Sequence, residues 1–136
     1  MAVQMLCAPG GETRFKAVAP VAASKYCAKV SAIPVMYIQG KMDAQRNGGN
    51  GIDVVNFFTS SNMCTSTSVP DTAVPTCQSA LDRMLVTPGC VTYQGCTAPT
   101  IWCSHNDNSY NTTDGNMHGW PCFASGAIAT FFGSLP

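Results

Sequence analysis

The apolar residues of this chain fall into short runs, separated by polar segments that contain glycine and proline. Residues 34–40 form the clearest run, with β-branched and aromatic residues between a proline and a glycine, which is typical of a strand. Because this run is almost continuously apolar, we expect its strand to be buried on both faces, as in a parallel sheet. Residues 15–21 predict a second buried strand, with Pro20 restricted to the strand's end.

Three segments have helical patterns. Residues 2–7 are good helix formers, and the Pro-Gly-Gly that follows ends the helix. Residues 52–60 space their apolar side chains at helical intervals, which favours an amphipathic helix. Residues 120–132 predict a final helix, in which Pro121 suits the first turn.

The remaining apolar segments lie in the second half of the chain. Residues 91–94 and 100–103 predict a hairpin of two short strands. Residues 64–89 are rich in Thr, Ser and Pro and predict a long excursion, with one or two helical turns over residues 79–85. Alternating helices and strands predict an α/β fold. Since the chain begins with a helix and offers few strands, we expect the later half of a larger sheet.

Size and charge narrow the range of functions. The chain has 136 residues, which is enough for one domain. Its formal net charge is zero and only 10% of its residues are charged, so nucleic acid and anionic membrane surfaces are not expected partners. The apolar runs are too short to span a bilayer.

The chain contains eight cysteines, none of them in a C-x-x-C pair, and the two histidines do not lie at zinc-ligand spacing from them. We therefore expect disulfides in an oxidising, extracellular compartment, and neither a metal nor another cofactor. Residues 1–6 are too short for a signal-peptide core. A secretion signal is expected upstream of this chain.

Two residues are candidates for an acid and a base. Asp43 follows the predicted strand of residues 34–40, and functional groups in open α/β sheets gather beyond the carboxyl ends of strands. His118 lies in the polar loop of residues 104–119, and histidine is suited to general base catalysis near neutral pH. Their order agrees with α/β-hydrolases, in which the triad runs Ser, Asp, His.

Each candidate has a plainer explanation. Asp43 alone is equally well explained as a turn cap, and a lone loop histidine usually has no catalytic task. His105 ranks second as the base, because it lies too near its strand for a reaching loop. Acidic and amide residues at 106–108, 114 and 116 lack the glycine and glutamate of a calcium-binding EF-hand loop, so we expect solvated turns there. The nucleophile motif G-x-S-x-G is absent from the sequence.

Five segments resemble secreted esterases related to polyhydroxybutyrate depolymerases and feruloyl esterases. In chain order they are residues 17–22, residues 35–43 (VMYIQGKMD), residues 90–96, residues 101–103, and His118-Gly119-Trp120-Pro121 with the apolar residues behind it. The resemblance implies that residues 1–136 form a single incomplete α/β-hydrolase domain, the C-terminal portion of the sheet, with parallel strands, a terminal hairpin and flanking helices.

The same resemblance implies roles for individual residues. Asp43 is similar to the triad acid and His118 to the triad base, and residues 2–7 resemble the helix that leaves the nucleophile. The serine is then expected just upstream of Met1, and the chain alone is expected to be inactive. Trp120 is a candidate wall of an acyl or aromatic pocket, or else a residue packed under the last helix.

The implied substrate is an ester: a feruloyl or acetyl ester of plant polysaccharide, or polyhydroxyalkanoate. The alternative function is a non-catalytic, disulfide-rich extracellular binding or structural module derived from such an esterase. In either case the cysteines would form disulfides that cross-link the chain. Candidate pairs are Cys96 with Cys103, and Cys64 or Cys77 with Cys90 or Cys122, among about 105 possible connectivities.

Overall fold

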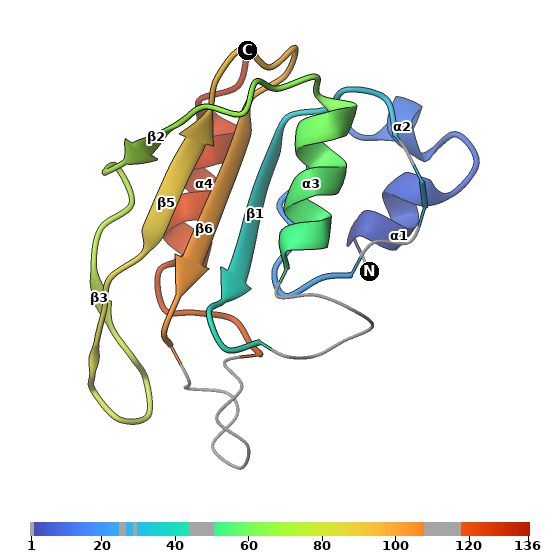
Figure 1. Cartoon of the computed structure of the whole chain (residues 1–136). Helices are drawn as coiled ribbons and strands as arrows, with labels where there is room; N and C mark the ends of the chain where they lie inside the picture. The colour runs from blue at the N-terminus through green and yellow to red at the C-terminus, as the bar shows by residue number, and fades with distance from the viewer. Residues whose placement is uncertain (1, 25–26, 29, 44–50, 108–117) are drawn as a thin grey trace.

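The computed structural model describes every residue except 1, 25–26, 29, 44–50 and 108–117 (Figure 1). Its centre is a mixed four-stranded sheet with the strand order β1-β6-β5-β2. These strands are β1 (Val35–Gly40), β2 (Ser68–Asp71), β5 (Gly89–Tyr93) and β6 (Thr100–His105). β1 and β6 are parallel, whereas β5 is antiparallel to both β6 and β2. The expected mixture of helices and strands, with a hairpin late in the chain, is confirmed.

Strand β1 stands at one end of the strand order and is the most deeply buried of the four strands. All six of its residues are buried, which confirms the expectation drawn from its apolar run. It pairs with β6 from Val35 opposite Thr100 to Gly40 opposite His105. The two strands therefore end side by side at one edge of the sheet, as their arrowheads show (Figure 1).

The apolar run of residues 15–21 pairs with β1 but does not form a regular strand. Two parallel bridges join Val18 to Val35 and Val21 to Ile38. Between them lies Pro20, which has no N–H, at the position where the ladder would require a donor. The expected strand is thus reduced to isolated bridges. The placement of Pro20 at the end of the strand was wrong, because the pairing continues on both sides of it.

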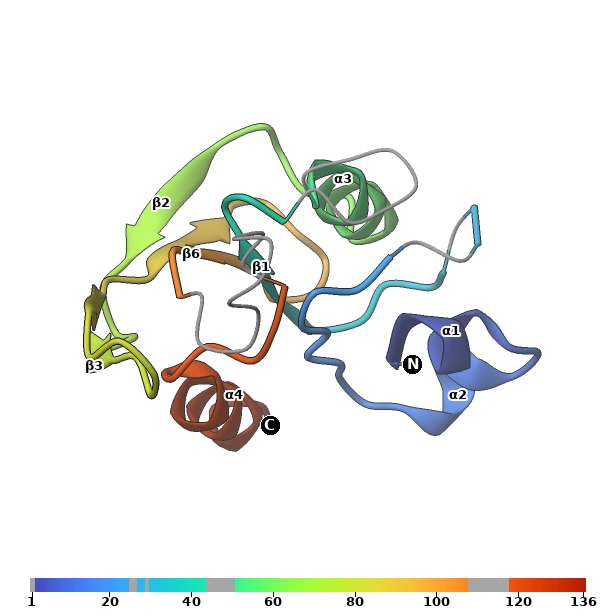
Figure 2. The ribbon, with the colours of Figure 1, turned by 90° about the horizontal axis from the view of Figure 1, so that it is seen from below.

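Helices cover both faces of the sheet, as the view from below shows (Figure 2). On one face lie α1 (Ala2–Cys7) and α3 (Ile52–Ser61), which share an apolar cluster with Val35 and Tyr37 of β1. On the other face lies α4 (Ala124–Gly133), whose buried residues share a cluster with Met36 and Ile38. Alternate side chains of β1 therefore serve opposite cores.

The predicted helices differ from the observed ones in three places. The final helix begins at Ala124 and not at residue 120, although Ala124 N–H bonds to the carbonyl of Pro121 in the turn before it. Ile52, which was expected on the buried face of α3, has a side chain that is 44% exposed. A short helix, α2 (Gly11–Arg14), follows α1 and was not predicted.

The helical turns expected over residues 79–85 are absent. This segment is the turn of a small hairpin between β3 (Cys77–Gln78) and β4 (Leu85–Val86). The side chain of Asp82 accepts a hydrogen bond from the N–H of Met84, and Arg83 has a left-handed φ of 59°. Both features favour a tight turn over a helix.

Four disulfides link the eight cysteines: Cys7–Cys27, Cys64–Cys96, Cys77–Cys122 and Cys90–Cys103. The expected Cys96–Cys103 pair was wrong, because Cys103 lies directly opposite Cys90 in the β5–β6 hairpin. The Cys77–Cys122 pair agrees with one of the alternatives. Such a set indicates an oxidising environment. Within the described ranges, the structure contains no helix of the length and apolarity that crossing a membrane requires.

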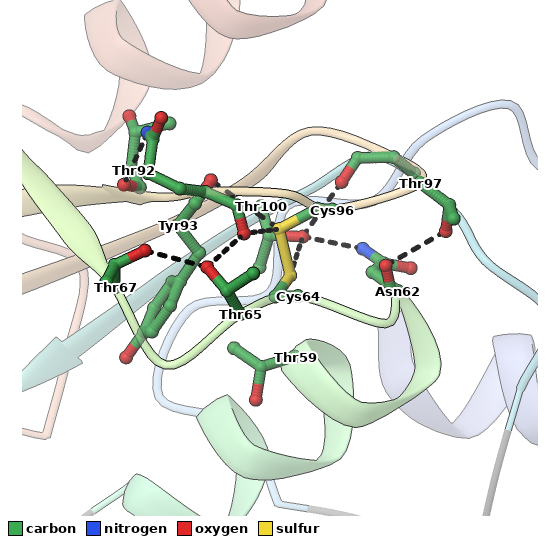
Figure 3. The surroundings of a disulfide bond; sticks show 12 residues. Thr59, Asn62, Cys64, Thr65, Thr67, Thr92, Tyr93, Cys96, Thr97 and Thr100 are labelled. Atoms are coloured by element: carbon green, nitrogen blue, oxygen red, sulfur yellow. Dashed lines mark hydrogen bonds between the residues drawn. A yellow bond between two sulfur atoms is a disulfide. The ribbon is translucent and has the colours of Figure 1, made fainter.

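The Cys64–Cys96 disulfide ties the end of α3 to the β5–β6 turn, within a polar cluster (Figure 3). Asn62 is fully buried there, and its amide N–H₂ donates to the carbonyl of Ile33 and to the hydroxyl of Thr100. Its backbone carbonyl accepts from Thr97. This cluster fixes the end of the sheet at which β1 and β6 begin, opposite the edge where both strands stop.

Candidate active site

Asp43 and His118, which are far apart in the sequence, meet at the carboxyl edge of β1 and β6. His118 Nδ1 lies 3.0 Å from Oδ2 of Asp43, within hydrogen-bond distance. The Asp43 side chain is 1% exposed, whereas that of His118 is 38% exposed. A buried carboxylate thus contacts one nitrogen of an imidazole that solvent can reach.

The turn after β1 explains the position of Asp43. The N–H of Lys41 donates to the carbonyl of His105 at 2.8 Å, which extends the β1–β6 pairing past the last strand residue. The N–H of Asp43 then donates to the carbonyl of Gly40 at 3.2 Å, which closes a tight turn. The chain reverses immediately beyond the strand, so the carboxylate stays buried over the sheet's edge.

A second side chain reaches the same carboxylate oxygen. Gln39, the penultimate residue of β1, donates from Nε2 to Oδ2 of Asp43 at 2.8 Å. Gln39 is not among the residues predicted for the site, although the sequence carries a signal for it: it is an amide within an otherwise apolar or aromatic strand, and a buried amide requires a partner.

The segment that carries His118 is fixed just after the histidine. Cys122 is joined to Cys77 by a disulfide, and its N–H donates to Oδ2 of Asp107 at 2.8 Å. Asp107 is 5% exposed, so the expectation of a solvated turn was wrong at this position. Asn106, another member of the proposed calcium-type cluster, is exposed as expected, and residues 108, 114 and 116 lie outside the described residues.

A cavity of about 340 Å³ opens beside His118. Its walls come from the start of α1, the segment that pairs with β1, and the residues that follow His118. The lining residues are Ala2, Ala19, Pro20, Val21, Ala22, Ala23, His118, Gly119 and Trp120. The imidazole therefore borders a space large enough for part of a small substrate.

One wall of this cavity has a strained backbone. Ala22 has a φ of 47°, in the left-handed region that residues other than glycine rarely adopt. Its N–H donates to the carbonyl of Ile38 at 2.9 Å, and the hydroxyl of Tyr37 donates to the carbonyl of Ala23 at 3.0 Å. Burial, together with the negative charge of Asp43, raises the pKa of Tyr37. Residues 17–22 carry part of the family resemblance, but no sequence pattern predicts the left-handed backbone of Ala22.

Trp120 borders the cavity and is 44% exposed, so it is not packed under the last helix. Its indole N–H donates to the hydroxyl of Ser125 in α4 at 3.1 Å. This bond fixes the ring at the cavity's rim, where it is available for contact with a ligand.

His105, the second-ranked base, has different surroundings. It is fully buried at the end of β6, and its Nδ1 accepts a hydrogen bond from the N–H of Asp107 at 3.2 Å. Its ring meets that of Phe123 edge-on, with the centroids 6.0 Å apart. Burial lowers the pKa of His105 to about 4. It is therefore neutral near pH 7 and enclosed.

Across the described residues, no group of three or more His, Cys, Asp or Glu side chains is arranged to hold a metal ion. Comparison with known protein families, with curated protein sequences and with solved structures finds no match to this chain. Any functional assignment therefore depends on the geometry of the site and on the sequence resemblance.

Proposed function

We propose that this chain is the C-terminal part of a secreted serine carboxylic-ester hydrolase with an α/β-hydrolase fold, of the polyhydroxybutyrate depolymerase and feruloyl esterase type. The hydrogen bond between Asp43 and His118, beside an open cavity, carries the proposal. A buried carboxylate behind an accessible imidazole is the acid–base half of a catalytic triad. The position of both residues beyond the carboxyl ends of parallel strands supports it.

In the proposed reaction a serine hydroxyl attacks the carbonyl carbon of the ester. Nε2 of His118 takes the serine proton and then donates it to the leaving alcohol. Asp43 keeps the other hydrogen of the ring on Nδ1 and stabilises the imidazolium as it forms. Water then attacks the acyl-enzyme, again with His118 as the base, and releases the acid and the serine.

The position of α1 suggests where the serine lies. In α/β-hydrolases the nucleophile occupies a sharp turn between a strand and the start of the next helix. Ala2, the first residue of α1, lines the same cavity as His118. We therefore assign α1 as the helix that leaves this turn, and the serine to residues that precede Met1. The oxyanion donors would come from the same upstream part.

The cavity also suggests the kind of group that is bound. Its alanine, proline and valine walls are apolar, and the Trp120 indole forms its rim. Such a surface suits the acyl or aromatic part of an ester. Feruloyl and acetyl esters of plant polysaccharide and polyhydroxyalkanoate all present such a group to an esterase.

A fluorophosphonate probe tests the proposal directly. The gene product that includes the residues before Met1 should be labelled on a serine shortly upstream of Ala2, and H118A should prevent labelling. Peptide mapping by mass spectrometry locates the label. A gene product that is not labelled would overturn the esterase assignment.

The 136-residue chain alone provides the complementary test. It should not hydrolyse p-nitrophenyl esters, because it lacks the nucleophile and the oxyanion donors. Turnover by the chain that disappears in H118A would show that the nucleophile lies within it, and would overturn its assignment to the upstream part.

A further inference from the structure

Gln39 is buried at a position where an amide has to be explained. Its side chain is 3% exposed, and the rest of β1 is apolar or aromatic. Burying an amide costs free energy unless its polar atoms are hydrogen-bonded. Nε2 has a partner, since it donates to Oδ2 of Asp43 at 2.8 Å, whereas Oε1 is buried and has no hydrogen-bond partner among the described residues.

This imbalance shows which contact determines the orientation of the amide. An ionised carboxylate only accepts hydrogen bonds, so Nε2 and not Oε1 has to face Asp43. The amide keeps this orientation although no described residue donates a hydrogen bond to its oxygen. The hydrogen bond to Asp43 is therefore the contact that sets the orientation of the Gln39 amide.

Gly51, directly before α3, packs closely against the Gln39 side chain. A Cβ atom at Gly51 would lie 2.6 Å from Cδ and 2.7 Å from Cγ of Gln39, which is too close for any side chain. Gly51 also has a φ of 72°, which favours glycine. The backbone at Gly51 thus lies close against the Gln39 side chain, at a distance that only glycine allows.

Two side-chain nitrogens converge on a single carboxylate oxygen. Oδ2 of Asp43 lies 2.8 Å from Nε2 of Gln39 and 3.0 Å from Nδ1 of His118. We propose that Gln39 is a positioning residue: its amide holds Oδ2 of Asp43 toward Nδ1 of His118, and so keeps the ring hydrogen of His118 on Nδ1. Only its catalytic meaning rests on the proposed function, in which this tautomer leaves Nε2 to accept the serine proton.

The test is the tautomer of His118, measured by ¹⁵N NMR on the oxidised chain at an alkaline pH where the imidazole is neutral. The wild-type chain should favour the Nδ1–H form about tenfold or more, the ratio expected from one hydrogen bond to a charged acceptor. It should also show a low-field Nδ1 proton. Q39M keeps the length of the side chain and removes the donor, so the ratio should fall several-fold and the low-field proton should move upfield.

Q94M is the matched control. Gln94 is exposed, and its Nε2 donates to the carbonyl of Thr92 at 3.3 Å, so the same substitution there should leave the His118 ratio unchanged. A wild-type tautomer ratio and low-field proton in folded Q39M would overturn the proposal.

A measurement on the wild-type chain covers the case in which Q39M does not fold. The two Nε2 hydrogens of Gln39 should exchange slowly with water and have well-separated resonances, unlike those of Gln94. Rapid exchange at Gln39 would overturn the proposal. None of these results depends on esterase activity. If the fluorophosphonate label is missing but the His118 tautomer depends on Gln39, only the proposed function is overturned. If the label is present but the tautomer does not depend on Gln39, only the role of Gln39 is overturned.

Discussion

Two histidines lie at the same edge of the sheet and differ in almost every physical respect. His105 is fully buried and accepts a hydrogen bond from the backbone of Asp107. His118 is 38% exposed, borders a cavity and contacts the carboxylate of Asp43. Nearness to a strand end is therefore not what makes a histidine a candidate base. An accessible ring with a buried carboxylate at one nitrogen is the distinguishing arrangement.

The largest expected effect separates the two histidines by activity. If the proposed function holds, H118A in the gene product that includes the residues before Met1 should lower kcat by about 10⁶-fold, because the general base is lost while oxyanion stabilisation remains. Hydrolysis of p-nitrophenyl esters by equal amounts of folded protein measures the loss. A loss of ten-fold or less in H118A would contradict this role of His118 and would indicate that another residue is the general base.

The second effect separates them by stability. H105A removes a buried ring that contacts Phe123, so the free energy of unfolding should fall by about 3 kcal/mol. H118A should cost only about 1 kcal/mol, since water can reach the vacated position and solvate Asp43. Urea unfolding of the two variants, with disulfides intact, tests this order. Equal losses would show that His118 is as much a structural residue as His105.

The third effect concerns acid. Burial lowers the pKa of His105 from 6.5 to about 4, so the unfolded chain takes up a proton there before the folded protein does. The free energy of unfolding should therefore fall as the pH falls from about 6.5 to 4, by as much as about 3 kcal/mol, and this term should then level off. The contribution of His105 to the free energy of unfolding is therefore complete above about pH 6.5 and is lost as the pH falls toward 4.

The variant H105F isolates this term, because phenylalanine fills the buried site without titrating. Its unfolding free energy should depend less steeply on pH between 4 and 6.5 than that of the wild-type chain. The free energy of unfolding of the wild-type chain relative to H105F, from urea unfolding at a series of pH values, should fall by as much as about 3 kcal/mol between pH 6.5 and pH 4. Parallel curves across this range would mean that His105 does not titrate as its burial requires.

Local patterns predicted the elements of this fold well and its long-range contacts poorly. The apolar run of β1 and the helix formers of α1 are local signals, and both elements were found. Strand ends and chain order predict that Asp43 and His118 lie at the same end of the sheet. They do not predict that the two side chains form a hydrogen bond. The pairing of Cys90 with Cys103 depends on the hairpin register, which the sequence does not specify.

The residues that were missed depend on tertiary contacts. Pro20 was read as the end of a strand, because sequence alone does not show that the bridges continue past it. Asp107 was read as solvated, because the backbone N–H of Cys122 that it binds arrives only through the fold. Gln39 was the exception: a lone amide in a buried strand signals a partner, although not which one.

The smallest expected effect concerns the wall of the cavity beside His118. Ala22 has a left-handed φ of 47°, which costs a residue with a Cβ about 1 kcal/mol more than glycine. A22G should therefore raise the free energy of unfolding by up to about 1 kcal/mol, less the added entropy of a glycine in the unfolded chain. The His118 ring resonances should shift in the same variant, because Ala22 and His118 line one cavity.

Arg83 supplies the control, since it has a φ of 59° in the β3–β4 turn and is not among the residues that line this cavity. R83G should relieve similar strain, yet leave the His118 resonances in place. If A22G destabilises the chain while R83G stabilises it, the contacts of the alanine methyl outweigh the strain at the wall. If both variants shift His118 equally, the ring responds to overall stability and not to its own cavity. A shift confined to A22G would show that the His118 ring responds to the backbone conformation of its own cavity wall, where a strained residue is a common feature of functional sites.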